Sequence, residues 1–343
     1  MTRGTPLPSV GPILERAIAD RVFPGAVVEV GRTNGAIATI VAGRQTYDTS
    51  SSPVDARTIY DLASLTKVLS TAPLMADELA TGRIKLNDRV RHWIPLWTGE
   101  DRQVVTIRDL LEHASGLPAH RPYYESKHGR AAFELAICEE PLAYTPRTQS
   151  IYSDLGFLLL GFALEDAAGA PLDRQFDAWR ERELGTDVEI SYWPGPHWYD
   201  RAAPTENTPS GEERRGNVHD EMTEALGGVA AHAGLFGTAA SVGLCAQWWM
   251  RSPALEQFST KSVVPGSSRA LAWDTMLPTS SCGTKLSASA IGHTGFTGTS
   301  LWIDAAKDLY VVILSNRVHP TRHHEGIRDV RRALHDAIVG DLA

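Results

Sequence analysis

The two ends of this 343-residue chain carry matching patterns, and these restrict the fold more than any other feature of the sequence. Near the N-terminus, apolar residues have helical spacing over 13–22 and alternate over 26–30 and 36–41, as strands do. The joining segment Arg32–Gly35 contains Asn-Gly, which tolerates the positive φ angles of a tight turn. The chain is therefore expected to begin with a helix and a hairpin.

The C-terminal end repeats these elements in mirror order. Residues 299–303 and 309–314 have the pattern of two strands, and a helix is expected over 326–339. We predict that the two hairpins share one antiparallel sheet.

Between the two ends, the apolar spacing is mainly helical. Helices are expected over residues 62–79, 107–113, 156–168, 172–182 and 241–250. A sheet built from both ends around a helical middle predicts an α+β fold. Residues 1–75 and 225–343 would form the sheet region with its helices, and residues 76–224 a mostly helical region in which 192–216 is a long ordered loop.

Composition and charge restrict the partners and the compartment. The formal net charge of −8 argues against nucleic acids or anionic membranes as partners, because both favour clustered Lys and Arg. No segment is both long and apolar enough to span a membrane, and Met1–Pro6 runs into an amphipathic stretch without the apolar core of an export signal. Three cysteines without CxxC spacing, Cys138, Cys245 and Cys282, fit free thiols in a reducing compartment. A cytoplasmic protein is expected.

The first chemically informative residue is Ser64, with Lys67 three residues later on the same helix face. A serine hydroxyl is a poor nucleophile until a base removes its proton, and burial can lower a lysine pKa by roughly 3 to 5 units from about 10.4. A helix N-terminus at Ser64 would add positive potential for a developing alkoxide. The alternative is that Ser64 only caps the helix and Lys67 lies at the surface.

The second informative residue is Tyr152, directly before the apolar stretch 155–164. A phenol close to a lysine can pass protons to and from a nucleophile and a leaving group. In the alternative interpretation, Ser153 or Asp154 caps the following helix while Tyr152 packs against it. Capping and catalysis are compatible at this position.

The third informative segment, Gly292–Gly298, lies at the entry to the C-terminal hairpin. Glycines on an edge strand let a substrate lie against the backbone, so that a neighbouring N–H, that of Phe296, could face an oxyanion. His293 could contact a carboxylate or phenolic end of the substrate. A glycine-rich β-bulge with a solvent-facing histidine is the structural alternative.

Together these three segments resemble the serine β-lactamase and penicillin-binding protein superfamily, for which Ser-x-x-Lys is typical. The resemblance is greatest to the class C β-lactamase and D-alanyl-D-alanine carboxypeptidase branch, where the second motif is Tyr-x-Asn and the third Lys-Thr-Gly or His-Thr-Gly. Here these motifs read Tyr152-Ser153-Asp154 and His293-Thr294-Gly295. Four further segments also resemble recurrent parts of the family: Phe23–Gly25, His113–Leu117, Gly234–Gly237 and Ser315–Arg317.

The resemblance implies an antiparallel sheet flanked by helices beside a helical region, with the active site in the groove between them. It implies that Ser64 is the nucleophile, Lys67 its base or proton partner, and Tyr152 the second proton-transfer group. Which of Lys67 and Tyr152 acts as the base stays open.

The resemblance also implies the rest of the site. Backbone N–H groups of Ser64 and Phe296 would form the oxyanion hole, each contributing about 2.7 to 4 kcal/mol. His293 and Thr294, followed by Gly295, would bind the far end of the substrate. No cofactor or metal is implied.

Asp154 departs from the family pattern, because β-lactamases usually have Asn at this position. An ionised carboxylate cannot donate a hydrogen bond to the acylamino carbonyl of a substrate. It would also pair with Lys67 and hold it protonated, which shifts the role of base toward Tyr152. Weak or no penicillin turnover is therefore expected, and the missing export signal separates the chain from cell-wall enzymes.

Other site chemistries have weaker support. His219-Asp220-Glu221, His232 and His323-His324 lack the His-Glu-x-x-His spacing of a metal site. A Ser115 nucleophile with His113 would lack helical or elbow geometry. The segment from Gly216 to Gly228 is expected near the rim of the groove.

Three functions remain open from the sequence. The first is a serine hydrolase acting on small esters or amides through a Ser64 acyl-enzyme, with esterase-like activity favoured. The second is a D,D-carboxypeptidase, D-aminopeptidase or muropeptide amidase. The third is a non-catalytic binding module, which the presence of Ser64, Lys67 and Tyr152 argues against. In each case the partner would be a small ester, amide or short peptide, and the oligomeric state stays open.

Overall fold

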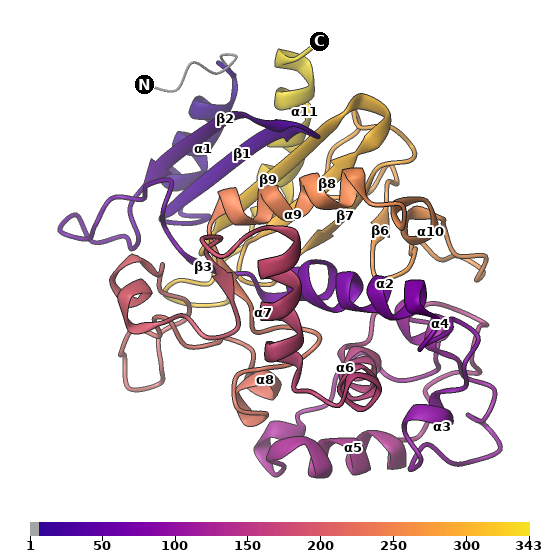
Figure 1. Ribbon diagram of the computed structural model, residues 1–343. Coiled ribbons are helices and arrows are strands. Elements are labelled where there is room, and N and C mark those ends of the chain that lie inside the picture. The colour runs from indigo at the N-terminus through magenta and orange to yellow at the C-terminus, as the bar shows by residue number, and fades with distance from the viewer. Residues whose placement is uncertain (1–6) are drawn as a thin grey trace.

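A computed structural model describes residues 7–343, and its centre is a six-stranded antiparallel sheet (Figure 1). The strands lie in the order β2-β1-β9-β8-β7-β6. Their bounds are β1 (Gly25–Arg32), β2 (Gly35–Gly43), β6 (Asp274–Thr275), β7 (Ile291–Thr294), β8 (Ser300–Asp304) and β9 (Leu309–Ser315). The prediction about the N-terminal Met1–Pro6 lies outside the described residues.

The two ends of the chain meet in the middle of this sheet. β1 pairs with β9 from Ala26 opposite Ser315 to Gly31 opposite Tyr310, which confirms that the two hairpins share one sheet. Alternate residues of β1 enter opposite cores, because successive side chains of a strand point to opposite faces. Val27 belongs to one hydrophobic core and Val28 to the other. The predicted α+β fold is confirmed.

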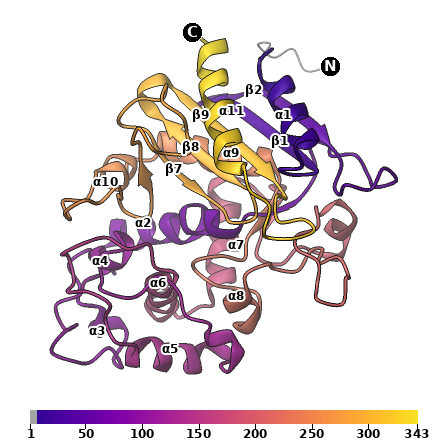
Figure 2. The same ribbon diagram turned by 180° about the vertical axis from the view of Figure 1, so that it is seen from behind.

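Helices cover both faces of the sheet (Figures 1 and 2). On one face, α1 (Val10–Ala19) and α11 (Ile327–Asp341) lie side by side and bury apolar residues against β1 and β9. On the other face lies α9 (Ala239–Arg251), which separates the sheet from the helical part of the molecule. Helices on both faces thus hold the sheet rigidly in place. One end of β7 remains uncovered and can border a site.

The remaining helices and short strands form the second part of the molecule. At its centre α6 (Asp154–Ala168) is buried from Leu155 to Leu164, and the Ser153 side chain caps its N-terminus by accepting a hydrogen bond from the Gly156 N–H at 3.2 Å. The other α-helices are α2 (Ala72–Thr81), α3 (Val90–Trp93), α4 (Ile107–Leu111), α5 (Gly129–Glu139), α7 (Leu172–Glu183), α8 (Glu221–Ala225) and α10 (Leu255–Ser259). Short 3-10 turns are η3 (Tyr123–Glu125), η4 (Pro196–Arg201) and η5 (Ala305–Lys307). A small sheet joins β3 (Tyr60–Asp61), β5 (Phe236–Gly237) and β4 (Ile190–Ser191).

One predicted helix is wrong in detail. The stretch 62–79 is not a single α-helix: a 3-10 turn, η1 (Ala63–Leu65), is followed by a π-helical segment, η2 (Lys67–Thr71), before α2 begins. The π-helical pattern of hydrogen bonds adds a residue per turn, and apolar spacing does not reveal it. Ser64 therefore lies in a tight turn and not in the first turn of an α-helix.

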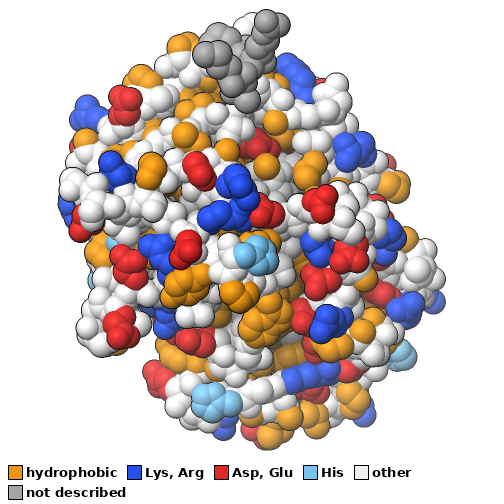
Figure 3. Space-filling model, turned by 60° about the vertical axis from the view of Figure 1, so that its left-hand side comes forward, with side chains coloured by type: hydrophobic (Ala, Val, Ile, Leu, Met, Phe, Trp, Pro, Cys, Tyr) orange, Lys and Arg blue, Asp and Glu red, His pale blue; other side chains and the backbone are white. Residues whose placement is uncertain are grey.

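The surface carries its charges in a mixed pattern. On the face shown in Figure 3, acidic and basic side chains are interspersed, and neither kind gathers into a large area. Within residues 7–343 no single helix is long and apolar enough to cross a membrane; α6 and α7, which meet at a bend of 74°, reach that length and composition only as a pair.

Candidate active site

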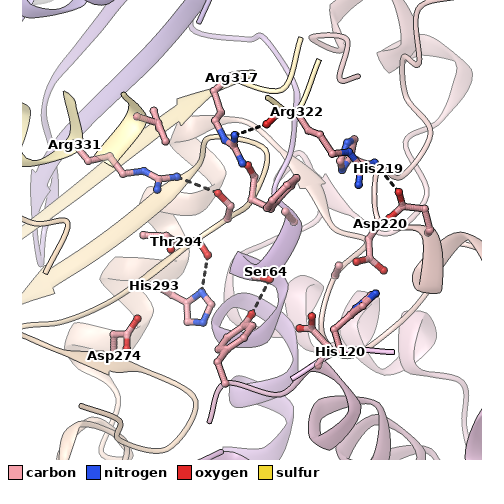
Figure 4. Close-up of a pocket in the computed structure, with 18 of the residues that line it drawn as sticks. Ser64, His120, His219, Asp220, Asp274, His293, Thr294, Arg317, Arg322 and Arg331 are labelled. Atoms are coloured by element: carbon pink, nitrogen blue, oxygen red, sulfur yellow. Dashed lines mark hydrogen bonds and ion pairs between the residues drawn. The ribbon is translucent and has the colours of Figure 1, made fainter. Parts of the chain in front are cut away.

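Ser64 lies in a tight turn that several buried contacts hold in place. The preceding residue, Ala63, has a φ of +47°, which a residue with a side chain adopts only when its surroundings enforce it. The enforcing group is the buried Asp61 carboxylate, which accepts hydrogen bonds from the N–H of Ala63 at 2.8 Å and of His219 at 2.7 Å. The turn presents Ser64 to the pocket drawn in Figure 4.

Lys67 is fully buried directly beneath this turn. Its Nζ donates to three oxygens: Ser64 Oγ at 3.1 Å, Asp154 Oδ1 at 2.8 Å and the His232 carbonyl at 2.9 Å. Burial lowers the pKa of Lys67, but the charge and hydrogen bonds of Asp154 and Tyr152 outweigh it, so the pKa is raised above its ordinary value. Lys67 is therefore an ammonium at neutral pH.

Tyr152 approaches Ser64 from the start of α6. Its hydroxyl donates to Ser64 Oγ at 2.8 Å, and the Lys67 Nζ lies 4.8 Å from the centre of its ring. Burial raises the pKa of Tyr152, although the charge of Lys67 lowers it in part, so the resting phenol keeps its proton. The structure thus brings the alcohol, the ammonium and the phenol within hydrogen-bond distance.

His113 supports the tyrosine, a role that the sequence did not indicate. Its ring lies 4.6 Å from the Tyr152 ring and 5.0 Å from that of Phe157. Its Nδ1 accepts the Ser153 N–H at 2.9 Å, so this nitrogen carries no proton. Burial, with the nearby charge of Arg269, lowers the pKa of His113 well below its usual value, and the ring packs as a neutral imidazole.

Asp154 completes the cluster as the anionic partner of Lys67. One carboxylate oxygen receives the Lys67 ammonium, while the side chain, 19% exposed, lines the pocket. The pairing expected from the sequence is therefore present. A carboxylate at this place offers the substrate only hydrogen-bond acceptors.

The glycine-rich segment packs directly against the Ser64 turn. A Cβ on Gly295 would lie 2.1 Å from Thr299 Oγ1 and 2.7 Å from the Leu62 carbonyl, so only glycine fits there. The Thr297 hydroxyl donates to the Asp61 carbonyl at 2.7 Å and ties the segment to the same turn. Ser64, Thr294, Gly295 and Phe296 consequently share the wall of one pocket of about 520 Å³.

His293 lines the pocket, so its contact with a substrate stays a prediction, whereas the solvent-facing alternative is not met. Its side chain is only 2% exposed, so it does not face solvent, and its Nδ1 lies 3.0 Å from the Thr294 carbonyl. Burial, with the charge of Lys67, lowers the pKa of His293 well below the usual value. The neutral ring therefore offers a substrate no positive charge, and its Nε2 has no partner among the described residues.

Positive charge in the pocket comes instead from arginines that sequence reasoning missed. Arg317 and Arg322 flank the exposed Phe296 ring at 4.5 and 6.0 Å, and Arg331 reaches the pocket from α11. Arg269 lies 5.1 Å from the Tyr152 ring centre and pairs with Asp274 at 2.7 Å. Only Arg317 lies in a segment that the sequence had marked as similar to a family segment.

The rim segment predicted between Gly216 and Gly228 does border the pocket. His219 stacks on Phe296 with ring centres 5.7 Å apart, and Asp220 accepts a hydrogen bond from His232 at 2.8 Å. Within residues 7–343 no group of three or more His, Cys, Asp or Glu side chains is arranged to hold a metal ion. The loop 192–216 contributes no residue to the pocket wall.

Acidification below pH 6.5 is expected to destabilise the fold through the buried imidazoles. Burial lowers the pKa of His335 from 6.5 to about 4, and those of His113 and His293 fall in the same direction. The unfolded chain then binds more protons, so stability present above pH 6.5 is lost as the pH falls toward 4. For His335 the difference of about 2.5 units corresponds to about 3 kcal/mol.

Urea unfolding midpoints at pH 8, 6 and 5 measure this loss. A His335→Leu variant removes one titrating group and should show a shallower dependence on pH. Equal midpoints at pH 8 and 5 in the parent protein would contradict the expectation.

Known proteins match the chain over nearly its whole length. The family model described as Beta-lactamase matches residues 13–335. A protein of Escherichia coli (strain K12) named "Putative D-alanyl-D-alanine carboxypeptidase" is 32% identical over 306 residues, which cover 76% of this chain and 70% of that protein.

Solved structures resemble the fold at lower identity. A class C β-lactamase from Rhodobacter sphaeroides has a TM-score of 0.78 at 17% identity and covers 98% of this chain and 99% of its own. The hydrolase EstCE1, described as having promiscuous acyltransferase activity, has a TM-score of 0.76 at 20% identity and covers 95% of this chain and 97% of its own. At these identities the likeness concerns the fold.

Proposed function

The chain belongs to the Beta-lactamase family and is a hydrolase of the serine β-lactamase type, and on this premise we propose that it cleaves small esters through an acyl-enzyme on Ser64. The observation that carries the proposal is the convergence on Ser64 Oγ of the Lys67 ammonium at 3.1 Å and the Tyr152 hydroxyl at 2.8 Å. Such an arrangement serves to move a serine proton and stabilise the resulting charge.

In the acylation step Ser64 Oγ forms a bond to the ester carbonyl carbon, and the bond from that carbon to the leaving oxygen breaks. The serine proton passes to the phenol oxygen of Tyr152 while the phenol proton passes to the leaving alcohol. This shuttle does not require Tyr152 to lose its proton beforehand. It therefore suits a phenol whose pKa is raised by burial. Deacylation runs the same transfers in reverse, with water in place of the alcohol.

Lys67 acts in its charged form in this proposal. Its ammonium stabilises the negative charge that develops on Ser64 Oγ, and Asp154 holds it in place at 2.8 Å. The backbone N–H of Phe296 donates to none of the described residues and is available, together with that of Ser64, to the carbonyl oxygen of the substrate.

Asp154 favours simple esters over β-lactams and acylated D-amino-acid peptides. The acylamino carbonyl of those amides needs a donor near the nucleophile, and the carboxylate at 154 supplies only acceptors. The same group keeps Lys67 charged. We therefore propose an esterase-like activity with weak or no penicillin turnover, on substrates small enough for the pocket of about 520 Å³.

A second candidate is a D-alanyl-D-alanine carboxypeptidase, an amidase or an aminopeptidase acting on related short peptides. The E. coli relative bears the first of these names, and Arg317 and Arg322 give the pocket positive charge beside Phe296 that suits a substrate carboxylate. Cytoplasmic location and the absence of nucleic-acid partners remain predictions.

A substrate panel separates these proposals. Hydrolysis of p-nitrophenyl acetate and butyrate is compared with that of D-alanyl-D-alanine peptides, muropeptides and benzylpenicillin. In parallel, a fluorophosphonate should add one adduct mass, which peptide mapping places on Ser64. We expect ester turnover to exceed peptide and penicillin turnover.

Each other result has a definite meaning. Faster cleavage of the D-alanyl-D-alanine peptides would favour the second candidate, and an adduct on a serine other than Ser64 would contradict both. The absence of both turnover and an adduct would support a binding module without catalysis.

A further inference from the structure

We propose that Arg331 is a positioning residue, which orients the peptide N–H of Phe296 toward the oxyanion of the substrate. The inference rests on the proposed acyl-enzyme function and deepens it. Arg331 lies on the C-terminal helix α11, far along the chain from Ser64, and no sequence motif connects it with catalysis.

Arg331 is buried beside the pocket and serves two backbone carbonyls. Its side chain is 6% exposed, and its Nη2 donates to the Thr299 carbonyl at 2.7 Å and to the Gly295 carbonyl at 3.0 Å. No Asp or Glu of residues 7–343 forms an ion pair with it. A charge that is buried at such cost and bonded only to carbonyls is typical of a group that holds backbone in place.

The Gly295 carbonyl belongs to the peptide group that carries the Phe296 N–H. This peptide is trans, since the one cis bond in the described chain precedes Pro320, and in a trans peptide the C=O and N–H point in opposite directions. Arg331 lies on the side of the segment away from Ser64 in Figure 4. By holding the carbonyl there, it turns the Phe296 N–H toward the nucleophile.

The next peptide is held in the same manner. Arg317 Nε donates to the Phe296 carbonyl at 2.8 Å, and Gly295 fits so closely against Leu62 that the segment cannot shift toward Ser64. Arg331 and Arg317 thus fix the carbonyls of two successive peptide groups. The peptide group that Arg331 fixes is the one whose N–H, that of Phe296, faces the substrate. Oxyanion donors act through such preorganisation, and an error of about 1 Å in placement can cost roughly a hundredfold in rate.

The test compares two neighbouring arginines of α11. Arg332 also donates to two carbonyls, those of Ser280 at 2.6 Å and Pro278 at 3.2 Å, but these lie outside the pocket. Arg331→Met is expected to lower kcat for p-nitrophenyl acetate by about 10- to 100-fold with KM changed less than twofold. Arg332→Met should leave both within twofold, and Arg331→Lys, which keeps one cationic donor nitrogen without the planar guanidinium, should fall between.

A second measurement separates positioning from a loss of stability. A boronic acid that adds to Ser64 imitates the tetrahedral oxyanion, whereas the carboxylate product does not. Affinity for the boronic acid should fall in Arg331→Met and Arg331→Lys by the same factors as kcat, while product affinity stays the same.

The remaining outcomes each support or overturn the positioning role. Unchanged kcat in Arg331→Lys and Arg331→Met, or equal losses in the Arg331 and Arg332 variants, would overturn the positioning role. If Arg331→Met does not fold, a loss of kcat and boronic acid affinity in folded Arg331→Lys supports the role, and their retention overturns it. A parent protein that neither hydrolyses esters nor takes up the fluorophosphonate refutes the proposed function itself.

Discussion

Ser64→Ala is expected to lower kcat for every ester by a factor on the order of 10⁶ and to abolish the fluorophosphonate adduct. The alanine removes the atom on which Lys67 Nζ and the Tyr152 hydroxyl converge, so the remaining groups have no nucleophile to activate. The fold should persist, because residue 64 is partly exposed and its turn is held by Asp61 and not by the serine hydroxyl. Initial rates, intact mass and thermal melting measure the three effects.

Ser115→Ala provides the matched control. Ser115 is the alternative nucleophile that the sequence offered beside His113, but it is buried and absent from the pocket wall. His113 is also occupied, since its Nδ1 accepts the Ser153 N–H. The Ser115 variant should keep the adduct and most of its activity, whereas ester turnover above a hundredth of the parent value in Ser64→Ala would refute the assignment of the nucleophile.

Lys67→Arg is expected to lower kcat by about 10³-fold although it preserves the positive charge. The ammonium donates in three directions, to Ser64 Oγ, Asp154 Oδ1 and the His232 carbonyl, and a planar guanidinium cannot reproduce this arrangement. The aromatic ring of Phe157, 5.4 Å from Nζ, leaves a larger head group little space. The loss comes from misplaced donors and not from a titrating group, so activity should stay low at every pH.

The control for this variant is Lys127→Arg, at an exposed position that does not line the pocket. Thermal melting must show that Lys67→Arg is folded before its kinetics are interpreted. Near-full turnover in the folded variant would exclude Lys67 as the charged partner of the reaction.

The parts of the fold that could be predicted are those with a regular apolar period. The strands near both ends were placed within about two residues, because short stretches of β-branched and apolar residues between turn signals mark them. The helix 129–139 and the two-residue strands of the small sheet were missed, since they are too short or too mixed in composition to show a period. The π-helical segment 67–71 was missed because hydrogen-bond register is set by the surrounding tertiary contacts.

The candidate site divides in the same way. Ser64, Lys67 and Tyr152 could be found because spacing and chemical type identify them together, and the geometry brings them into contact. The arginines could not, because a long side chain from α11 or from the end of β9 reaches the pocket only through the folding of the whole chain. The burial of His293, which lowers its pKa and keeps the ring neutral, is not visible in a His-Thr-Gly motif.

The pairing of β1 with β9 has a consequence for biosynthesis. The two strands are about 280 residues apart in the sequence. β1 can therefore pair with β9 only after nearly all of the chain has left the ribosome. Contacts of such long range form late and slowly. The Phe296 segment and Arg331 belong to the same late region, so a half-synthesised chain contains Ser64 but not yet the segment that packs against its turn.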